Sequence, residues 1–274
     1  MSRRRRAPMK LRSPTKKAIV LPALHPNAGL RAAYQKQLDR LIDEMHVSLL
    51  YWLKASYRAN APEIAQDASP AMALRQAVQR LSSRWQKRFD DAAPELAKYF
   101  TKRAASTTDA ALKGALKKAG FTVEFSMTKV TNDVMQATIG EQIGLIKSIA
   151  SKHLADVQGM VMRSVSAGRD LGTLTQELEQ RYAITKRRAA FIALDQNNKA
   201  TASMMRVRQE ALGLDEAKWL HSHGGKHPRK SHLAVDGKRY NVKKGMYIDG
   251  EYVWPGQKPG CRCISQCVIP GIDE

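Results

Sequence analysis

The spacing of apolar residues predicts helices over most of the chain and a different structure after Gly213. Between residues 29 and 60 the apolar side chains recur at steps of three and four positions, at Leu38, Leu41, Ile42, Met45, Leu49 and Trp52. This period places them on one face of a helix. We therefore predict a helix from Gly29 to about Asn60, before Pro62.

Two prolines mark the expected starts of the next helices. Ser69-Pro70 is a capping residue followed by a first-turn proline, which predicts a helix to about Phe89. Pro94 predicts the start of another helix, which ends at Gly120. Residues 121–125 alternate between apolar and polar side chains and favour a short strand.

The stretch before Gly213 again has helical periodicity. Residues 131–153 are predicted to be helical, and one apolar face continues to Gly168. A short amphipathic helix is expected over residues 173–182 and a long one over residues 185–212, closed by Gly213.

The composition changes at Gly213, and glycine, proline and histidine become frequent after Trp219. Asp249-Gly250 lies between β-branched and aromatic residues, which predicts a hairpin with a type I′ turn. Asp236-Gly237 is a second, weaker turn signal. We therefore predict a mainly-α protein, with an elongated helical body and a small β-rich C-terminal module that carries histidines and cysteines.

These patterns divide the chain into four expected regions. They are a basic flexible arm over residues 1–28, an N-terminal helical region over 29–130, a second helical region over 131–213 and the β-rich module over 214–274.

Charge is concentrated in the arm. The chain has 46 Lys+Arg against 25 Asp+Glu, a net charge of +21, and its first 38 residues contain ten Lys or Arg and no acidic residue. Such an arm is suited to a polyanion, most commonly double-stranded DNA, or to an acidic protein surface. A solvated tail is the alternative. The expected contact residues are Arg3, Arg4, Arg5, Arg6, Lys10, Arg12, Lys16 and Lys17.

The arm does not resemble a signal peptide. The apolar run over residues 18–21 is stopped by Pro22, too soon for a signal-peptide core. No stretch approaches the roughly 20 apolar residues that span a membrane, so we expect no membrane span.

Histidine and cysteine cluster at the C-terminal end. Four of the seven histidines and all three cysteines lie in the last 54 residues. Tetrahedral zinc accepts two imidazoles and two thiolates, so we predict a zinc site at His221, His232, Cys261 and Cys263. The alternative is that the histidines are hydrogen-bonding surface residues and the cysteines pack as small apolar groups.

Two arginines beside these residues are candidate structural groups. The guanidinium groups of Arg229 and Arg262 are expected to be buried and to bind a carboxylate such as Asp236, or loop carbonyls. An exposed basic patch is the alternative.

Catalytic motifs are not evident. The chain has no phosphate-binding loop, no dinucleotide-binding glycine pattern and no His-Glu-x-x-His, and no family signature surrounds Cys267 as a nucleophile. A metal-dependent nuclease would need carboxylate ligands, and only Asp236 and Asp249 lie near the histidines. We therefore expect no enzymatic activity and no small-molecule substrate.

The C-terminal module contains an ordered set of residues: Trp219, Arg229 with His232, Pro255-Gly256 and Cys261-Arg262-Cys263. This set resembles the signature of phage Mu F-like head morphogenesis proteins. In that family, in the same order, a Trp opens the module, an Arg-x-x-His follows, and a Pro-Gly precedes a Cys-Arg-Cys. The resemblance covers about residues 132–269. The expected structural signature is Trp219, Arg229, Asp236, Gly245, Pro255, Gly256 and Arg262.

The chain departs from the family at His223, where a small or acidic residue is common, and this leaves open which histidine binds a metal. The resemblance implies a minor head protein of a tailed bacteriophage that acts in capsid assembly and DNA packaging. Portal and other head proteins are its implied partners. It is expected in the virion, inside the capsid or at the portal vertex, and in the host cytoplasm during assembly. A DNA-binding protein that uses its arm, or a metal-dependent nuclease or toxin-like enzyme, is the alternative.

Overall fold

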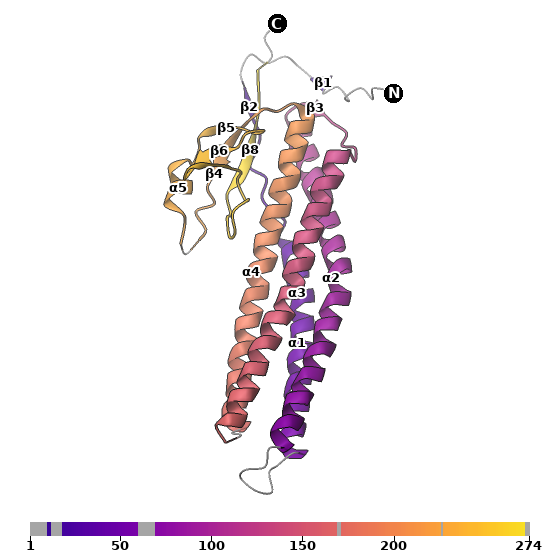
Figure 1. Cartoon of the computed structure of the whole chain (residues 1–274). Helices are drawn as coiled ribbons and strands as arrows, with labels where there is room; N and C mark the ends of the chain where they lie inside the picture. The colour runs from indigo at the N-terminus through magenta and orange to yellow at the C-terminus, as the bar shows by residue number, and fades with distance from the viewer. Residues whose placement is uncertain (1–9, 12–17, 60–68, 169–170, 226, 272–274) are drawn as a thin grey trace. The chain divides into compact units, whose positions relative to one another are not determined.

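The computed structural model describes residues 10–11, 18–59, 69–168, 171–225 and 227–271. Within these residues the chain forms five helices and eight strands. The four long helices are α1 (Ala28–Ala59), α2 (Ser69–Lys118), α3 (Lys129–Ser166) and α4 (Leu171–Leu212). This arrangement confirms the mainly-α prediction (Figure 1). No helix among the described residues is both long and apolar enough to cross a membrane.

The chain divides into two compact units. The first, the helical bundle, comprises residues 32–98 and 139–193. The second, the terminal unit, comprises residues 1–31, 99–138 and 194–274. The boundaries predicted at residues 130 and 213 do not coincide with these units, because α2, α3 and α4 each contribute to both.

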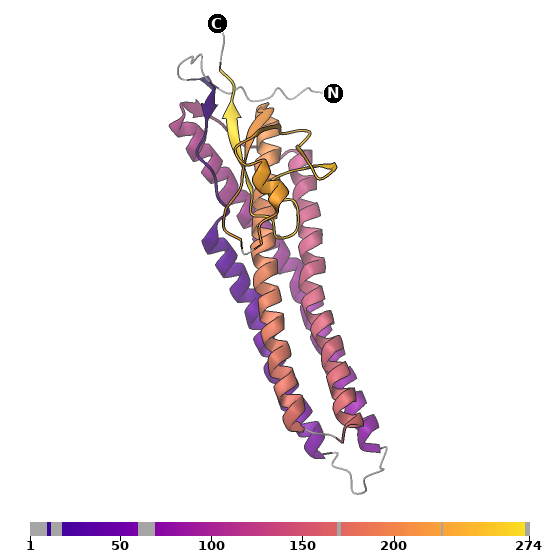
Figure 2. The same ribbon diagram turned by 90° about the vertical axis from the view of Figure 1, so that its left-hand side faces the viewer.

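Segments of the four long helices lie side by side in the helical bundle (Figure 1, Figure 2). Polar contacts join each helix to the next and α4 back to α1. They are Trp85 Nε1 to Ser48 Oγ at 3.0 Å, Lys147 Nζ to Asp90 Oδ1 at 3.6 Å, His153 Nδ1 to Thr185 Oγ1 at 2.9 Å and Lys186 Nζ to Asp43 Oδ1 at 2.8 Å. Together with the buried apolar residues they define a closed bundle.

Two predicted helix boundaries are wrong. Pro94 lies inside α2 and does not start a new helix. Proline has no backbone N–H to donate within the helix. The helix nevertheless continues past Pro94 because residues on both sides of it are buried: Phe89, Ala93 and Ala97 are each 0% exposed. The break expected between residues 182 and 185 is also absent from α4, where no glycine or proline occurs from Thr173 to Leu212.

Short strands distinguish the terminal unit. A four-stranded sheet has the order β2 (Ile19–Val20), β8 (Ile264–Ile269), β4 (Glu216–Leu220) and β5 (Arg239–Asn241), with antiparallel neighbours. Separate pairs are β1 (Lys10–Leu11) with β3 (Phe121–Thr122), and β6 (Met246–Ile248) with β7 (Glu251–Val253).

The predicted hairpin is confirmed at β6 and β7. Both residues of its turn have a positive φ, 54° for Asp249 and 85° for Gly250. These angles are those of the type I′ turn, whose twist matches the flanking strands.

The prediction of a flexible arm over residues 1–28 is wrong for residues 19–21. Ile19 and Val20 form β2 on the edge of β8, and the N–H of Leu21 donates to the carbonyl of Cys267 at 3.0 Å. Leu21 is only 1% exposed, because this apolar run completes the sheet and its core. Of the predicted arm contacts, Lys10 lies in β1. Arg3, Arg4, Arg5, Arg6, Arg12, Lys16 and Lys17 lie outside the described residues.

The core of the terminal unit mixes helical and strand residues. Leu112 and Leu116 of α2 pack with Met205 of α4, Leu21 and Cys267. Strand β8 therefore shares a core with the adjoining helix ends. A second buried cluster, which includes Trp219, Tyr240, Cys261 and Cys263, consists of C-terminal residues alone.

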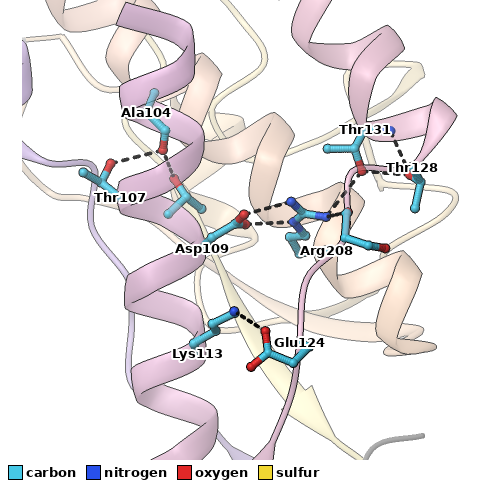
Figure 3. A network of polar contacts seen from close by, with 10 residues as sticks. Ala104, Thr107, Asp109, Lys113, Glu124, Thr128, Thr131 and Arg208 are labelled. Atoms are coloured by element: carbon cyan, nitrogen blue, oxygen red, sulfur yellow. Dashed lines mark hydrogen bonds and ion pairs between the residues drawn. The ribbon is translucent and has the colours of Figure 1, made fainter. Parts of the chain in front are cut away.

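A buried arginine links the helices of the terminal unit (Figure 3). Arg208 of α4 is 3% exposed and donates to both carboxylate oxygens of Asp109 of α2 at 2.8 Å. It also donates to the Ser126 carbonyl at 2.8 Å, and its guanidinium lies 4.9 Å from the centre of the Phe125 ring. The connection between α2 and α3 is thereby fixed to α4.

Candidate metal centre

Three of the predicted metal ligands come together in the terminal unit. His232 lies in the short helix α5 (Lys230–Ala234), and Cys261 and Cys263 lie in the loop before β8. The Nδ1 atom of His232 is 3.5 Å from the Cys261 sulfur and 3.6 Å from the Cys263 sulfur. Each of the three residues is 3% exposed. We call this group the metal centre.

These distances fit a zinc ion. Zinc bonds of about 2.3 Å to sulfur and about 2.0–2.1 Å to nitrogen, at a tetrahedral angle, separate the sulfur and nitrogen atoms by about 3.6 Å. The three candidate ligand atoms all lie within 4.8 Å of one another. Thiolate and imidazole are also the donor types that zinc prefers in proteins. The residues of the metal centre therefore can hold a zinc-like cation.

The ring of His232 is fixed by Trp219 of β4. The two rings meet edge to face, with centroids 5.1 Å apart and an interplanar angle of 87°. Trp219 is 0% exposed and also contacts Tyr240 of β5. The tryptophan of the expected signature thus forms one wall of the metal centre.

The two sulfurs of the metal centre shift each other's pKa in opposite directions. The Cys263 thiol, followed by the backbone of Cys263 and Gly256, lowers the pKa of Cys261 to about 5 against the effect of burial. The contact with Cys261, followed by burial, raises the pKa of Cys263. Cys261 is therefore the sulfur that ionises more readily.

His221, the fourth predicted ligand, does not join this group among the described residues. Its Nδ1 accepts a hydrogen bond from the N–H of His223 at 3.0 Å. The spacing of residues in the sequence does not predict this hydrogen bond, because it depends on the conformation of the loop. His223 has a positive φ of 52°.

Asp236 maintains that loop conformation. One of its carboxylate oxygens accepts the N–H of His221 at 2.8 Å, and the other lies 2.8 Å from Nε2 of His223. The hydrogen bond from the His221 backbone is the main cause that lowers the pKa of Asp236. Asp236 is therefore an ionised anchor of the loop rather than a metal ligand.

The side chains of Arg229 and Arg262 bind loop carbonyls as predicted, but both residues are exposed rather than buried. Arg229 donates to the carbonyl of Pro259 at 2.8 Å, and Arg262 donates to the carbonyl of Gly224. Arg262 points outward because the residues on both sides of it, Cys261 and Cys263, point inward.

Helix α4 supplies residues that sequence reasoning missed. Asp195 accepts the N–H of Gly260 at 2.6 Å, and Asn198 donates to the carbonyl of Cys261 at 3.2 Å. Asp195 and Asn198 are 5% and 8% exposed. The available signal was a run of four consecutive polar residues, Asp-Gln-Asn-Asn over residues 195–198, in the middle of the predicted helix.

Two signature glycines lie where no side chain fits. A Cβ on Gly256 would lie 2.8 Å from the Cβ of Ala202 in α4, and the glycine has a φ of 79°. A Cβ on Gly245 would lie 2.8 Å from the carbonyl oxygen of Val253. Pro255-Gly256 thus lets the loop that carries the cysteines pack directly on α4.

Cys267 is separate from the metal centre. It is 2% exposed, and Gln209 donates to its sulfur at 2.9 Å. Burial raises the pKa of this thiol to about 11. A neutral, enclosed thiol of this kind is a core residue and not a nucleophile.

Comparison with known protein families matches the part of the chain that contains the metal centre. The model of the family described as Phage Mu protein F like protein matches residues 155–266. This region is similar to the Mu F-like family. It includes Trp219, the metal centre and the α4 residues that bind its loop. The residues of the expected signature all lie in the matched region.

One relative extends the comparison. An uncharacterized protein of Haemophilus influenzae is 32% identical over 145 residues, which are 53% of this chain and 31% of that protein. The chain thus matches about a third of the length of this relative. No solved structure matches the chain significantly.

Proposed function

We propose that this protein acts in head morphogenesis of a tailed bacteriophage, as a minor head protein associated with the portal. The observation that carries the proposal is the match of residues 155–266 to the Mu F-like family, together with the metal centre enclosed by that region. The helical bundle offers long exposed helix faces for protein contacts. The role is structural and involves no turnover.

Isolation of heads from phage that carry this gene tests the assignment. Portal-containing heads are expected to retain the protein in few copies, and cross-linking is expected to join it to the portal. Complete heads assembled normally without the protein would contradict the proposal.

We further propose that the metal centre holds one Zn²⁺ ion that stabilises the terminal unit. The two buried thiols and the imidazole support this, because their ligand atoms lie within 4.8 Å of one another and are of the types that zinc prefers. Full-length protein is expected to contain one equivalent of zinc, and Cys261→Ser to lose it. Cys267→Ser is the matched control, because that thiol lies outside the metal centre and its variant is expected to retain zinc. Zinc-free wild-type protein purified without chelators would contradict the assignment.

The arm is proposed to contact packaged DNA. Its support is the run of ten basic and no acidic residues among the first 38. Steeply salt-dependent DNA affinity is the expected behaviour, because bound Lys and Arg release counterions from the phosphates.

A further inference from the structure

We infer that the metal centre takes three ligands from this chain and leaves a fourth coordination position for a donor from outside it, such as water or an imidazole. The inference rests on the zinc site proposed above. Among the described residues, no fourth His, Cys, Asp or Glu joins His232, Cys261 and Cys263. Closed structural zinc sites have four protein ligands, whereas sites with three keep an exchangeable position.

His221 is the fourth ligand predicted from the sequence, and its hydrogen bond argues against that role. The N–H of His223 donates to Nδ1 of His221 at 3.0 Å, so Nδ1 is the acceptor nitrogen of the ring. A neutral imidazole with an acceptor Nδ1 carries its proton on Nε2. Nε2 then has no free lone pair for a metal ion, and ligation would require the bond from His223 to break.

The neighbours of His221 are also engaged. Nε2 of His223 lies 2.8 Å from one oxygen of Asp236, and the N–H of His221 occupies the other oxygen. These contacts hold the loop in a conformation that supplies no ligand. Rearrangement would break three hydrogen bonds, those from the N–H of His223, from Nε2 of His223 and from the N–H of His221.

The metal centre lies close to the protein surface on this side. Arg262, which lies between the two cysteines, donates to the carbonyl of Gly224, and both Arg262 and Ser222 are exposed. Gly224 and Gly225, which follow in the loop, are exposed and have no side chain to cover the site. A small donor therefore has a short path to the metal centre.

Cobalt substitution of the full-length protein tests the inference. Visible absorption of Co²⁺ reports the number and type of its ligands, and free imidazole serves as the probe of the fourth position. We expect wild-type protein to bind one equivalent of Co²⁺ and to show a saturable shift of its visible bands with imidazole. His221→Ala and the matched control His227→Ala are expected to keep both the affinity for Co²⁺ and the imidazole response.

The possible outcomes distinguish a failure of the open fourth position from a failure of the proposed zinc site. If wild-type protein binds Co²⁺ but ignores imidazole, the fourth position is closed and the inference is wrong. If His221→Ala also weakens Co²⁺ binding by more than the about 10–100-fold typical of indirect partners, His221 is the missing ligand. If wild-type protein binds no Co²⁺ or Zn²⁺, the metal site itself is wrong.

Discussion

In the helical bundle, buried residues follow helical spacing and neighbouring helices meet over long segments. The terminal unit, in contrast, has strands of two to six residues and contains the three buried candidate metal ligands. The bundle is stabilised by many contacts of similar kind, so the loss of one weakens it only in part. The strands of the terminal unit depend on a few specific contacts between residues far apart in the sequence. Asp195 and Gly260, for example, are 65 residues apart. Single changes in the two units should therefore have different consequences.

The largest effect is expected from Arg208→Ala in the terminal unit. The change leaves Asp109 without its buried partner, and the loss of one member of such a pair costs about 3–5 kcal/mol. Urea unfolding monitored by circular dichroism measures the free energy of unfolding.

Lys113→Ala is the matched control for Arg208→Ala. The pair of Lys113 with Glu124 lies at the surface, where such pairs contribute less than about 1 kcal/mol (Figure 3). Equal losses in the two variants would contradict the importance assigned to the buried network.

A pH-dependent effect is expected in the helical bundle. Burial, with a smaller effect of Arg181, lowers the pKa of His153 to about 4, below about 6.5 in the unfolded chain. The unfolded state then binds more protons between these values, so stability is complete above pH 6.5 and is lost as the pH falls toward 4. The loss is up to about 3 kcal/mol. His153→Gln should flatten this part of the profile of unfolding free energy against pH, and an unchanged slope would refute the role of His153.

A somewhat smaller effect is expected from Gly256→Ala. The new methyl group meets Ala202 in α4 and the backbone stays in the left-handed region, which together cost about 2–3 kcal/mol. Adding Ala202→Gly should restore part of the loss. Gly225→Ala is the control, because no atom lies within 4 Å of its Cβ. Similar melting temperatures for Gly256→Ala and Gly225→Ala would show that the loop does not pack on α4 as described.

The smallest effect on stability is expected from deletion of residues 1–17. The deletion removes eight Lys or Arg and the two-residue strand β1, but it keeps β2 and Leu21 in the four-stranded sheet. Stability should change little, while DNA affinity and its salt dependence should fall. Deletion of residues 1–27 is the contrasting variant, since it also removes β2 and should destabilise the terminal unit. DNA affinity unaffected by the shorter deletion would exclude the arm as the contact.

The sequence allowed the bundle to be predicted better than the terminal unit. Apolar periodicity located α1 closely, and it failed at Pro94 because tertiary burial outweighed the cost of one proline in a helix. His232, Cys261 and Cys263 were predicted as ligands from residue type alone. The exclusion of His221 depends on one loop hydrogen bond, and the roles of Asp195 and Asn198 depend on contacts across more than 60 residues. Local patterns do not contain such information.

Hydrogen exchange of the full-length protein with and without a zinc chelator tests the central claim most directly. If zinc at the metal centre stabilises the terminal unit, chelation should remove protection from β4, α5, β5 and the loop before β8. Protection should persist in the parts of α1–α4 that form the helical bundle. Equal protection of both units before and after complete removal of zinc would contradict the account.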